Sequence, residues 1–343
     1  MTPNSAPPSP IVQPSESELA VAAGQLKLLR DALANVLFGQ EELIELVITG
    51  LVARGHMLLE GLPGLGKTEL VKGLSKALRL DSKRVQFTPD LLPGDITGNP
   101  LLQEVDGTRR FVFQPGPLFA NIVLADEINR ASPKTQSALL EAMQERRVTV
   151  MGETHPLPDP FFVLATQNPI ELEGTYPLPE AQLDRFLFKL EVRRASADTL
   201  QRIVLQREIG IEPDVTPVLE REQFIALTAL ARRIYMPDVV AGYIARIVDA
   251  THGSGGIVRF GASPRAALAL ASASKARALL SGRLNASFED VRALAPAVLR
   301  HRVVLDYTAK LEGKTSDAFV AGLLETVPAN PKVLPNTLQS AKI

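Results

Sequence analysis

Short apolar runs alternate with amphipathic segments through the first part of the chain. Between about residues 16 and 194, runs typical of buried strands are separated by stretches in which apolar residues recur at helical spacing. The strand candidates are 56–60, 84–87, 121–125, 161–166 and 186–192, and the clearest helices are 67–79 and 133–146. This alternation predicts an α/β core in which a parallel sheet is covered by helices on both faces.

The pattern changes near residue 195, and no further strand is predicted. Apolar residues then recur at helical spacing in segments 196–208, 222–235, 237–252, 264–281 and 288–300. We therefore expect a core over 16–194 and a small all-α bundle over 195–326. The remaining residues, 1–15 and 327–343, are rich in Pro, and we expect a disordered N-terminal tail and an extended C-terminal one. The N-terminal stretch lacks the basic end and apolar centre of a secretory signal.

Two segments depart from plain strand–helix alternation. Val148 and Val150 alternate with polar residues before Gly152 ends the run, which predicts a β-hairpin near 147–157. The segment 91–120 is punctuated by Gly, Pro and Asp, and two short strands near its centre, 99–104 and 109–113, flank a turn. The hairpin near 147–157 could contact a substrate or could be solvated with only a packing role, and the loop 91–120 could face a substrate or partner.

Composition narrows the classes of function. The formal net charge of −1 gives no general attraction to nucleic acid or anionic membrane. There are no cysteines, which excludes disulfides, thiolate metal sites and cysteine nucleophiles, and we expect a reducing, cytoplasmic location. The four histidines are scattered and form no ligand pattern. No apolar run approaches the length of a membrane span, so membrane insertion is not expected.

Residues 61–68, GLPGLGKT, match the phosphate-binding pattern G-x-x-x-x-G-K-[ST]. A predicted strand precedes the motif and a predicted helix follows it. Glycines let the backbone turn tightly and bring N–H groups to phosphate oxygens, and the positive end of the helix faces the anion. Lys67 would reach the β- and γ-phosphates of ATP, and the Thr68 hydroxyl would bind Mg²⁺. The expected nucleotide contacts are Gly61, Pro63, Gly64, Leu65, Gly66, Lys67, Thr68 and Glu69.

Two acids, Asp126 and Glu127, follow the apolar strand 121–125. In P-loop proteins a second strand, beside the P-loop strand, ends in an acid that binds Mg²⁺, and Asp126 fits that role. Magnesium prefers carboxylate, hydroxyl and phosphate oxygens. Glu127 would polarise the water that attacks the γ-phosphate. The alternative is an acidic strand end that merely faces solvent.

The order of five motifs resembles the MoxR family of AAA+ ATPases. They are GLPGLGKT, LADEINRA at 124–131, ATQNP at 165–169, LPEAQLDRF at 178–186 and GASPRA at 261–266. The resemblance covers about residues 25–310. It implies an AAA+ P-loop core with an α-helical lid, and a homo-oligomeric ring, usually a hexamer, that binds ATP between subunits. It also implies a chaperone or remodelling factor, often for proteins with von Willebrand factor A domains, which bind a divalent metal.

The resemblance assigns roles to four further positions or segments. Asn168 matches the sensor-1 residue that helps to orient the attacking water, although it could simply cap a turn. Arg185 matches the arginine finger that reaches the neighbouring subunit's γ-phosphate, although a surface ion pair with Asp184 or Glu180 is the alternative. Arg265 matches sensor 2, expected to bridge lid and nucleotide in the same subunit, although it could be an ordinary helix-start arginine. Finally, the segment 36–43 resembles the adenine-contact region, with Phe38, Gly39 and Gln40 near the base.

Arg130 lies just past the acidic pair. It could act on a neighbouring subunit as a second arginine, or it could be a structural link. The sequence does not decide between these roles.

Four functions are compatible with these residues. The first is an ATP-hydrolysing ring that remodels partner proteins. The second is a nucleic-acid motor, which near-neutral charge, absence of Trp and lack of interleaved basic and aromatic residues disfavour. The third is the motor subunit of a metal chelatase, and the chain contains no evident porphyrin-handling region. The fourth is a nucleotide-dependent switch without turnover, which Glu127 disfavours because a switch does not need the base.

Overall fold

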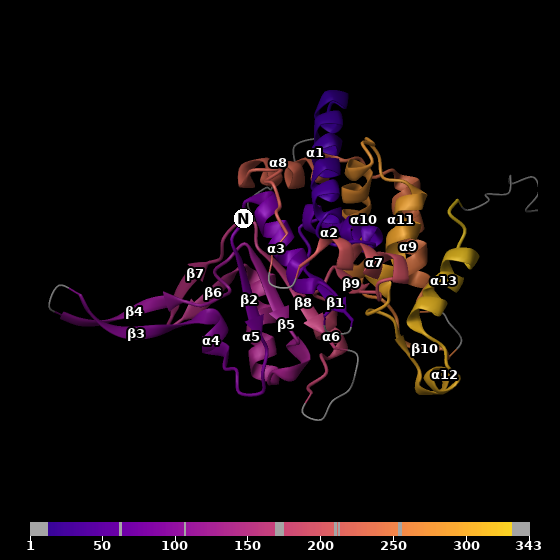
Figure 1. Ribbon diagram of the computed structural model, residues 1–343. Helices are drawn as coiled ribbons and strands as arrows, with labels where there is room; N and C mark the ends of the chain where they lie inside the picture. Colours follow the sequence, from indigo (N-terminus) through magenta and orange to yellow (C-terminus); the bar gives the residue numbers. More distant parts are fainter. Residues whose placement is uncertain are drawn as a thin grey trace, which may run out of the picture.

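The molecule consists of a sheet-containing core, a helical bundle on one side of it and long hairpins on the other (Figure 1). The structure is a computed structural model that describes residues 13–61, 64–105, 108–168, 175–208, 211, 213–252 and 256–330. The tail predictions for 1–12 and 331–343 therefore lie outside the described residues, and so does Pro63.

A five-stranded parallel sheet forms the centre of the core, with strand order β2-β5-β8-β1-β9. Its strands are β1 (Met57–Glu60), β2 (Ser82–Gln86), β5 (Ile122–Asp126), β8 (Phe162–Gln167) and β9 (Phe188–Glu191). Each lies at one of the five predicted apolar runs, and the parallel sheet is confirmed.

Successive side chains of these strands enter two separate hydrophobic cores, because strand residues point alternately to opposite faces. Met57 and Leu59 pack into the first core, while Leu58 packs into the second. Helices α1 (Glu16–Ala34), α2 (Glu41–Val52) and α3 (Lys67–Leu78) cover the first face. The second face is covered by α4 (Pro93–Thr97) and α5 (Pro133–Glu145). The 3₁₀ turn η1 (Ile128–Arg130) connects β5 to α5.

The sequence suggested that the strand ending in Asp126 lies beside the P-loop strand β1, and this prediction is wrong. Strand β8 pairs with both β1 and β5 and separates them. The chain runs from β1 to the sheet edge at β2, returns through β5, and only then fills the gap with β8. All three strands are parallel, so their carboxyl ends still meet at one edge of the sheet, with neighbouring strands about 4.8 Å apart.

The helical bundle contains a small sheet in addition to the expected helices. Its helices are α8 (Arg221–Arg233), α9 (Asp238–Ala250), α10 (Pro264–Leu280), α11 (Phe288–Leu299), α12 (Tyr307–Leu311) and α13 (Ser316–Thr326). Strands β10 (Val258–Phe260) and β11 (Val304–Leu305) pair antiparallel, so the bundle is not purely helical. Segments of three and two residues are too short for a period-two pattern to reveal them.

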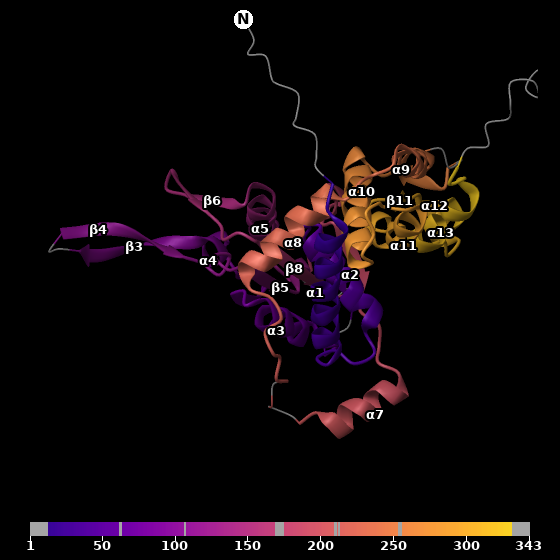
Figure 2. The same cartoon turned by 90° about the horizontal axis from the view of Figure 1, so that it is seen from above.

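Helix α7 (Ala197–Gln206) stands apart from the bundle, as Figure 2 shows. Its Thr199 faces Gly39, in the segment that leads into α2. Helix α8 contacts both α2 of the core and α10 of the bundle. The division of the chain at residue 195 therefore stays a prediction.

Both predicted hairpins form and extend to the same side of the molecule (Figures 1 and 2). Strands β3 (Gly98–Val105) and β4 (Thr108–Pro115) make the longer one, and β6 (Arg147–Val150) and β7 (Glu153–Pro156) the shorter. The aromatic rings of Phe113 and His155 stack with centroids 4.0 Å apart and join the two hairpins. Both confirm the turn signals in the sequence, and the first is longer than expected.

His56 makes the stability of the core depend on pH. Its Nε2–H donates to the carbonyl of Met143 at 3.0 Å, and its Nδ1 accepts from the N–H of Val163 at 3.0 Å. Burial, assisted by the charge of Arg146 and opposed by the bond to Met143, lowers the pKa of His56 to about 4. Only the neutral ring can make both bonds, because Nδ1 must remain an acceptor.

Acidification is expected to destabilise the protein through His56. Between its unfolded pKa, about 6.5, and its folded pKa, the unfolded chain binds a proton that the folded chain does not. The free energy of unfolding should fall by about 2 kcal/mol between pH 7.5 and 5 from this group alone. Urea unfolding at both pH values checks this: His56→Gln should be less stable at pH 7.5 and lose less stability on acidification. Equal losses in variant and wild type would contradict the assignment.

Candidate nucleotide-binding site

The nucleotide-binding loop connects β1 to α3 at the carboxyl edge of the sheet. Gly64 and Gly66 adopt left-handed φ values of +79° and +83°, which side chains disfavour. A Cβ on Gly66 would also lie 2.6 Å from the Leu37 side chain. Helix α3 begins at Lys67 directly after this turn, so its first N–H groups and the positive end of its dipole point out of the loop. These features make a binding place for a phosphate group.

A cavity of about 180 Å³ lies in front of this loop. Lys67, Thr68, Asp126, Glu127 and Asn168 all line it, so the ends of three strands deliver the predicted residues to one place. Nζ of Lys67 donates to the carbonyl of Gly61 at 2.7 Å. Burial lowers the pKa of Lys67, and the charges of Asp126 and Glu127 oppose that fall.

Asp126 is oriented by two neighbouring strands. Its Oδ1 accepts from the hydroxyl of Thr166 on β8 at 2.6 Å, and its Oδ2 accepts from Arg84 on β2 at 2.7 Å. Together with the Thr68 hydroxyl in the same cavity, the Asp126 carboxylate offers oxygen donors only. That donor set suits Mg²⁺, which completes its shell with phosphate and water oxygens. In the described part of the chain no group of three or more His, Cys, Asp or Glu side chains that could hold a metal ion occurs.

Glu127 occupies a strained position with φ of +55°. Its backbone N–H donates to Thr166 Oγ1 at 2.8 Å, so one threonine fixes both acids. Its Oε2 accepts from Gln86 at 2.9 Å and from Arg130 at 2.8 Å. Arg130 therefore forms a link within its own subunit.

A second cavity, of about 990 Å³, continues from the first. The two share Gly64, Gly66 and Glu69, so a nucleotide with phosphates at Lys67 can place its base in the larger one. Phe38, Gln40 and Leu65 line this larger cavity, and α7 closes its far side. The guanidinium groups of Arg202 and Arg207 lie 4.8 and 5.0 Å from the Phe38 ring centre.

The neighbours of Phe38 support the same cavity. Gly39 does not line it but turns the chain with φ of +68°. The side chain of Gln40 donates to the carbonyl of Arg193 at 2.9 Å, which ties the loop to the segment leading into α7.

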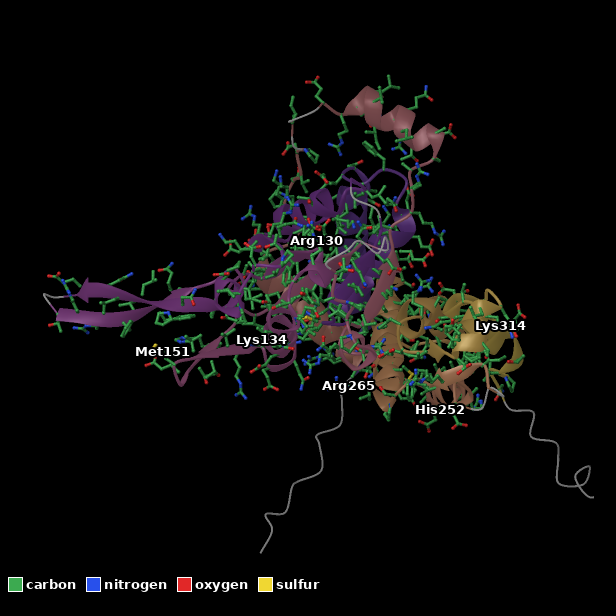
Figure 3. The ribbon with its side chains drawn as sticks, turned by 90° about the horizontal axis from the view of Figure 1, so that it is seen from below. Arg130, Lys134, Met151, His252, Arg265 and Lys314 are labelled. Atoms are coloured by element: carbon green, nitrogen blue, oxygen red, sulfur yellow. The ribbon has the colours of Figure 1, made fainter. Side chains whose placement is uncertain are left out.

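Arg185 and Arg265 line a different hollow, of about 350 Å³, in which Lys67 takes no part. Arg54, Arg146 and Arg302 line it too, against a single lining carboxylate, Asp184. Figure 3 shows Arg265 well apart from Arg130 and hence from the acids of the nucleotide cavity. Arg265 lines this hollow and not the cavity of Lys67, and its role at a nucleotide of its own subunit stays a prediction. Helix α10 starts beside Asp184, and the hydroxyl of Ser263, which precedes the helix, donates to Oδ2 of Asp184 at 3.0 Å.

The proposed surface ion pair of Arg185 is also not observed. Asp184 pairs with Arg302 at 2.7 Å, and among the described residues Arg185 forms no ion pair with Asp184 or Glu180. Arg185 lines the hollow without such a pair.

Comparison with known proteins agrees with this arrangement. A sequence model of the ATPase family associated with various cellular activities (AAA) matches residues 56–188, and one of the AAA lid domain matches 255–323. The chaperone MoxR1 of Mycobacterium tuberculosis is 40% identical over 96% of this chain and 89% of its own length. The chain belongs to the MoxR family of AAA+ ATPases.

Other relatives and a solved structure are similar over most of their length. The protein MoxR of Methylorubrum extorquens is 31% identical over 87% of this chain and 93% of its own. YeaC of Bacillus subtilis, an uncharacterized protein, is 48% identical over 85% of this chain and 91% of its own. The crystal structure of a presumed ATPase from Cytophaga hutchinsonii superposes with a TM-score of 0.85 at 36% identity, covering 91% of this chain and 97% of that one.

The structure adds three residues to the MoxR-family site that the sequence did not single out. Arg84 and Gln86 alternate along β2 and reach Asp126 and Glu127 respectively, and Thr166 joins both acids from β8. Arg84 and Gln86 are two positions apart and therefore lie on one face of their strand. Only the strand order shows that this strand pairs with β5, which carries Asp126. None of the described helices of this MoxR-family chain is long and apolar enough to cross a membrane.

Proposed function

We propose that this protein hydrolyses ATP within a ring of identical subunits, most simply a hexamer, and acts as a chaperone or assembly factor for other proteins. The main support is the separation of two half-sites in one chain. Lys67, Asp126 and Glu127 lie at one cavity, and Arg185 and Arg265 lie at another. A head-to-tail ring would bring the second half of each subunit to the first half of its neighbour.

Hydrolysis in this arrangement relies on positioning and electrostatics. Lys67 and the first N–H groups of α3 would bind the phosphates, and Thr68 and Asp126 would hold Mg²⁺. When bound, Mg²⁺ neutralises charge on the phosphate oxygens. Glu127, with Asn168, would orient the attacking water and accept its proton while the bond between the γ-phosphorus and the bridging oxygen breaks.

The neighbouring subunit would supply the remaining positive charge. Arg185 is suited to stabilise the charge that develops on the γ-phosphate, because its planar guanidinium presents several donors and stays charged. Arg265 lines the same hollow, so we propose that it also serves the neighbour's nucleotide rather than its own.

The two hairpins are proposed to contact the partner protein. Leu102 and Phe111 face each other across the β3–β4 hairpin and are exposed, and Met151 is exposed at the turn of the β6–β7 hairpin (Figure 3). Exposed apolar side chains on projecting elements favour contact with another polypeptide. Proteins with von Willebrand factor A domains are the partner class that we propose. No structural observation favours a chelatase motor or a nucleic-acid motor.

The proposal is tested by ATP turnover per subunit as a function of protein concentration. Turnover should rise with concentration and reach a plateau as rings form, since each site needs a neighbour. The concentration range should begin where the protein is shown to be monomeric. A measurable turnover rate that stays constant across this range would contradict a shared site. Sedimentation or mass photometry at the same concentrations supplies the oligomeric state.

A further inference from the structure

Arg302, which follows α11, donates several hydrogen bonds to the segment that carries Arg185. This side chain is 3% exposed and its Nε donates to Asp184 Oδ1 at 2.7 Å. Its Nη2 donates to the carbonyls of Asp184 and Phe186 at 3.1 and 2.6 Å, and its Nη1 donates to Leu187 at 3.1 Å and to Val298. Every N–H of the guanidinium is therefore used, and most of them hold the two sides of Arg185.

Two more residues of the helical bundle hold the same segment. His301 donates from Nε2 to the Phe186 carbonyl at 3.1 Å, and Ser263, which caps α10, donates to Asp184 Oδ2 at 3.0 Å. Burial, reinforced by the charge of Arg302, keeps the pKa of His301 well below its ordinary value. The ring is thus neutral, and Nε2 carries its proton because a carbonyl can only accept.

Arg185 itself is left out of this network. Its backbone neighbours are held by the bundle, and its side chain lines the arginine hollow beside Arg265. The groups on both sides of Arg185 are consequently held by Arg302 and His301, which lie more than a hundred positions later in the chain.

We infer that Arg302, acting on Asp184 and the adjoining carbonyls, is a positioning residue that couples the orientation of the helical bundle to the arginine finger Arg185. This inference rests on the proposed action of Arg185 on the neighbouring subunit. A rotation of the bundle would carry Arg302, His301 and Ser263 with it, and the Asp184–Leu187 segment would follow. A nucleotide-driven movement in one subunit would then change the finger that the same subunit presents to its neighbour.

Two substitutions of similar side-chain size test the hydrogen bonds between Arg302 and the segment that carries Arg185. Asp184→Asn removes the charge that Arg302 and Ser263 share, and Arg302→Lys replaces five fixed donors by three on a flexible stem. A matched control is Asp290→Asn, which breaks another Arg–Asp pair of the bundle, between the buried Asp290 and the partly exposed Arg283, with bonds of 2.6 and 2.9 Å, and touches no residue of the finger segment.

A misplaced finger should lower turnover without weakening ATP binding. At saturating protein and ATP, Asp184→Asn should reduce kcat by about 10–100-fold, as expected for a catalytic group displaced by about 1 Å, while KM for ATP stays within about threefold. The Asp290→Asn control should melt earlier but turn over normally below its melting temperature. Normal turnover in Asp184→Asn would overturn the inference. If the Arg302→Lys variant does not fold, the turnover of Asp184→Asn alone tests the inference.

Mixed rings separate a positioning role from general damage. A subunit with a misplaced finger keeps its own nucleotide site, so Lys67→Ala subunits, which bind no ATP but carry a normal finger, should rescue it. Random mixing at equal amounts makes about a quarter of the interfaces competent. Mixing Asp184→Asn with Arg185→Ala should give no rescue, because neither supplies a good finger.

The outcomes distinguish this inference from the proposed function. If Arg185→Ala is rescued by Lys67→Ala but Asp184→Asn is not, the shared site stands and the positioning role of the Arg302–Asp184 pair is wrong. If neither is rescued although the subunits co-assemble, the finger does not act between subunits and the proposed function fails first.

Discussion

Replacing Glu127 by Gln should abolish most hydrolysis while leaving ATP binding intact. The amide cannot accept a proton from the attacking water, and loss of a positioned general base lowers rates by about 10²–10⁴-fold. Its oxygen can still accept from Gln86 and Arg130, so the local geometry should survive. Phosphate release and fluorescent-nucleotide binding on the same preparation measure the two properties.

The control for this variant is Glu141→Gln, the same chemical change on the exposed face of α5. It should hydrolyse ATP as the wild type does. Turnover of Glu127→Gln at the wild-type rate would remove Glu127 from the mechanism. The expected variant has a practical value as well: it should hold ATP-bound rings together and retain partner proteins for identification.

Arg185→Ala should bind ATP normally and turn over about 10³-fold more slowly, the lower end of the effect of removing an arginine finger. The structure agrees with the expected direction of the effect, because Arg185 lines a hollow separate from Lys67 and has no carboxylate partner among the described residues. Arg185→Lys should recover little, since a lysine lacks the planar fork that matches phosphate oxygens.

Steady-state turnover at saturating protein measures this effect, and the removal of an exposed arginine on α1, Arg30→Ala, is the matched control. Equal amounts of Arg185→Ala and Lys67→Ala subunits should recover activity that neither has alone. Full activity of Arg185→Ala would show that the charge on the γ-phosphate is stabilised by another group.

Much of the core could be predicted from local patterns. Strand runs such as 121–125 and the GLPGLGKT turn are specified by residues a few positions apart, through side-chain alternation and the need for left-handed backbone at Gly64 and Gly66. The same patterns marked Lys67, Thr68, Asp126 and Glu127, which the structure brings to one cavity. The pair β10–β11 was missed because five residues in all carry no usable period.

The amino-acid sequence alone therefore predicted the five strands of the main sheet, the phosphate loop and the family. Tertiary packing decided three things beyond the sequence pattern: the place of β8 between β1 and β5, the hollow that Arg185 and Arg265 both line, and the bonds from Arg302 to the finger segment. The physical reason is the separation along the chain over which each interaction acts. Periodicity and turn chemistry act over a few residues, whereas strand order and the orientation of the bundle follow from burial and hydrogen bonds between distant residues, 118 positions apart for Arg302 and Asp184 and 215 for Arg233 and Glu18.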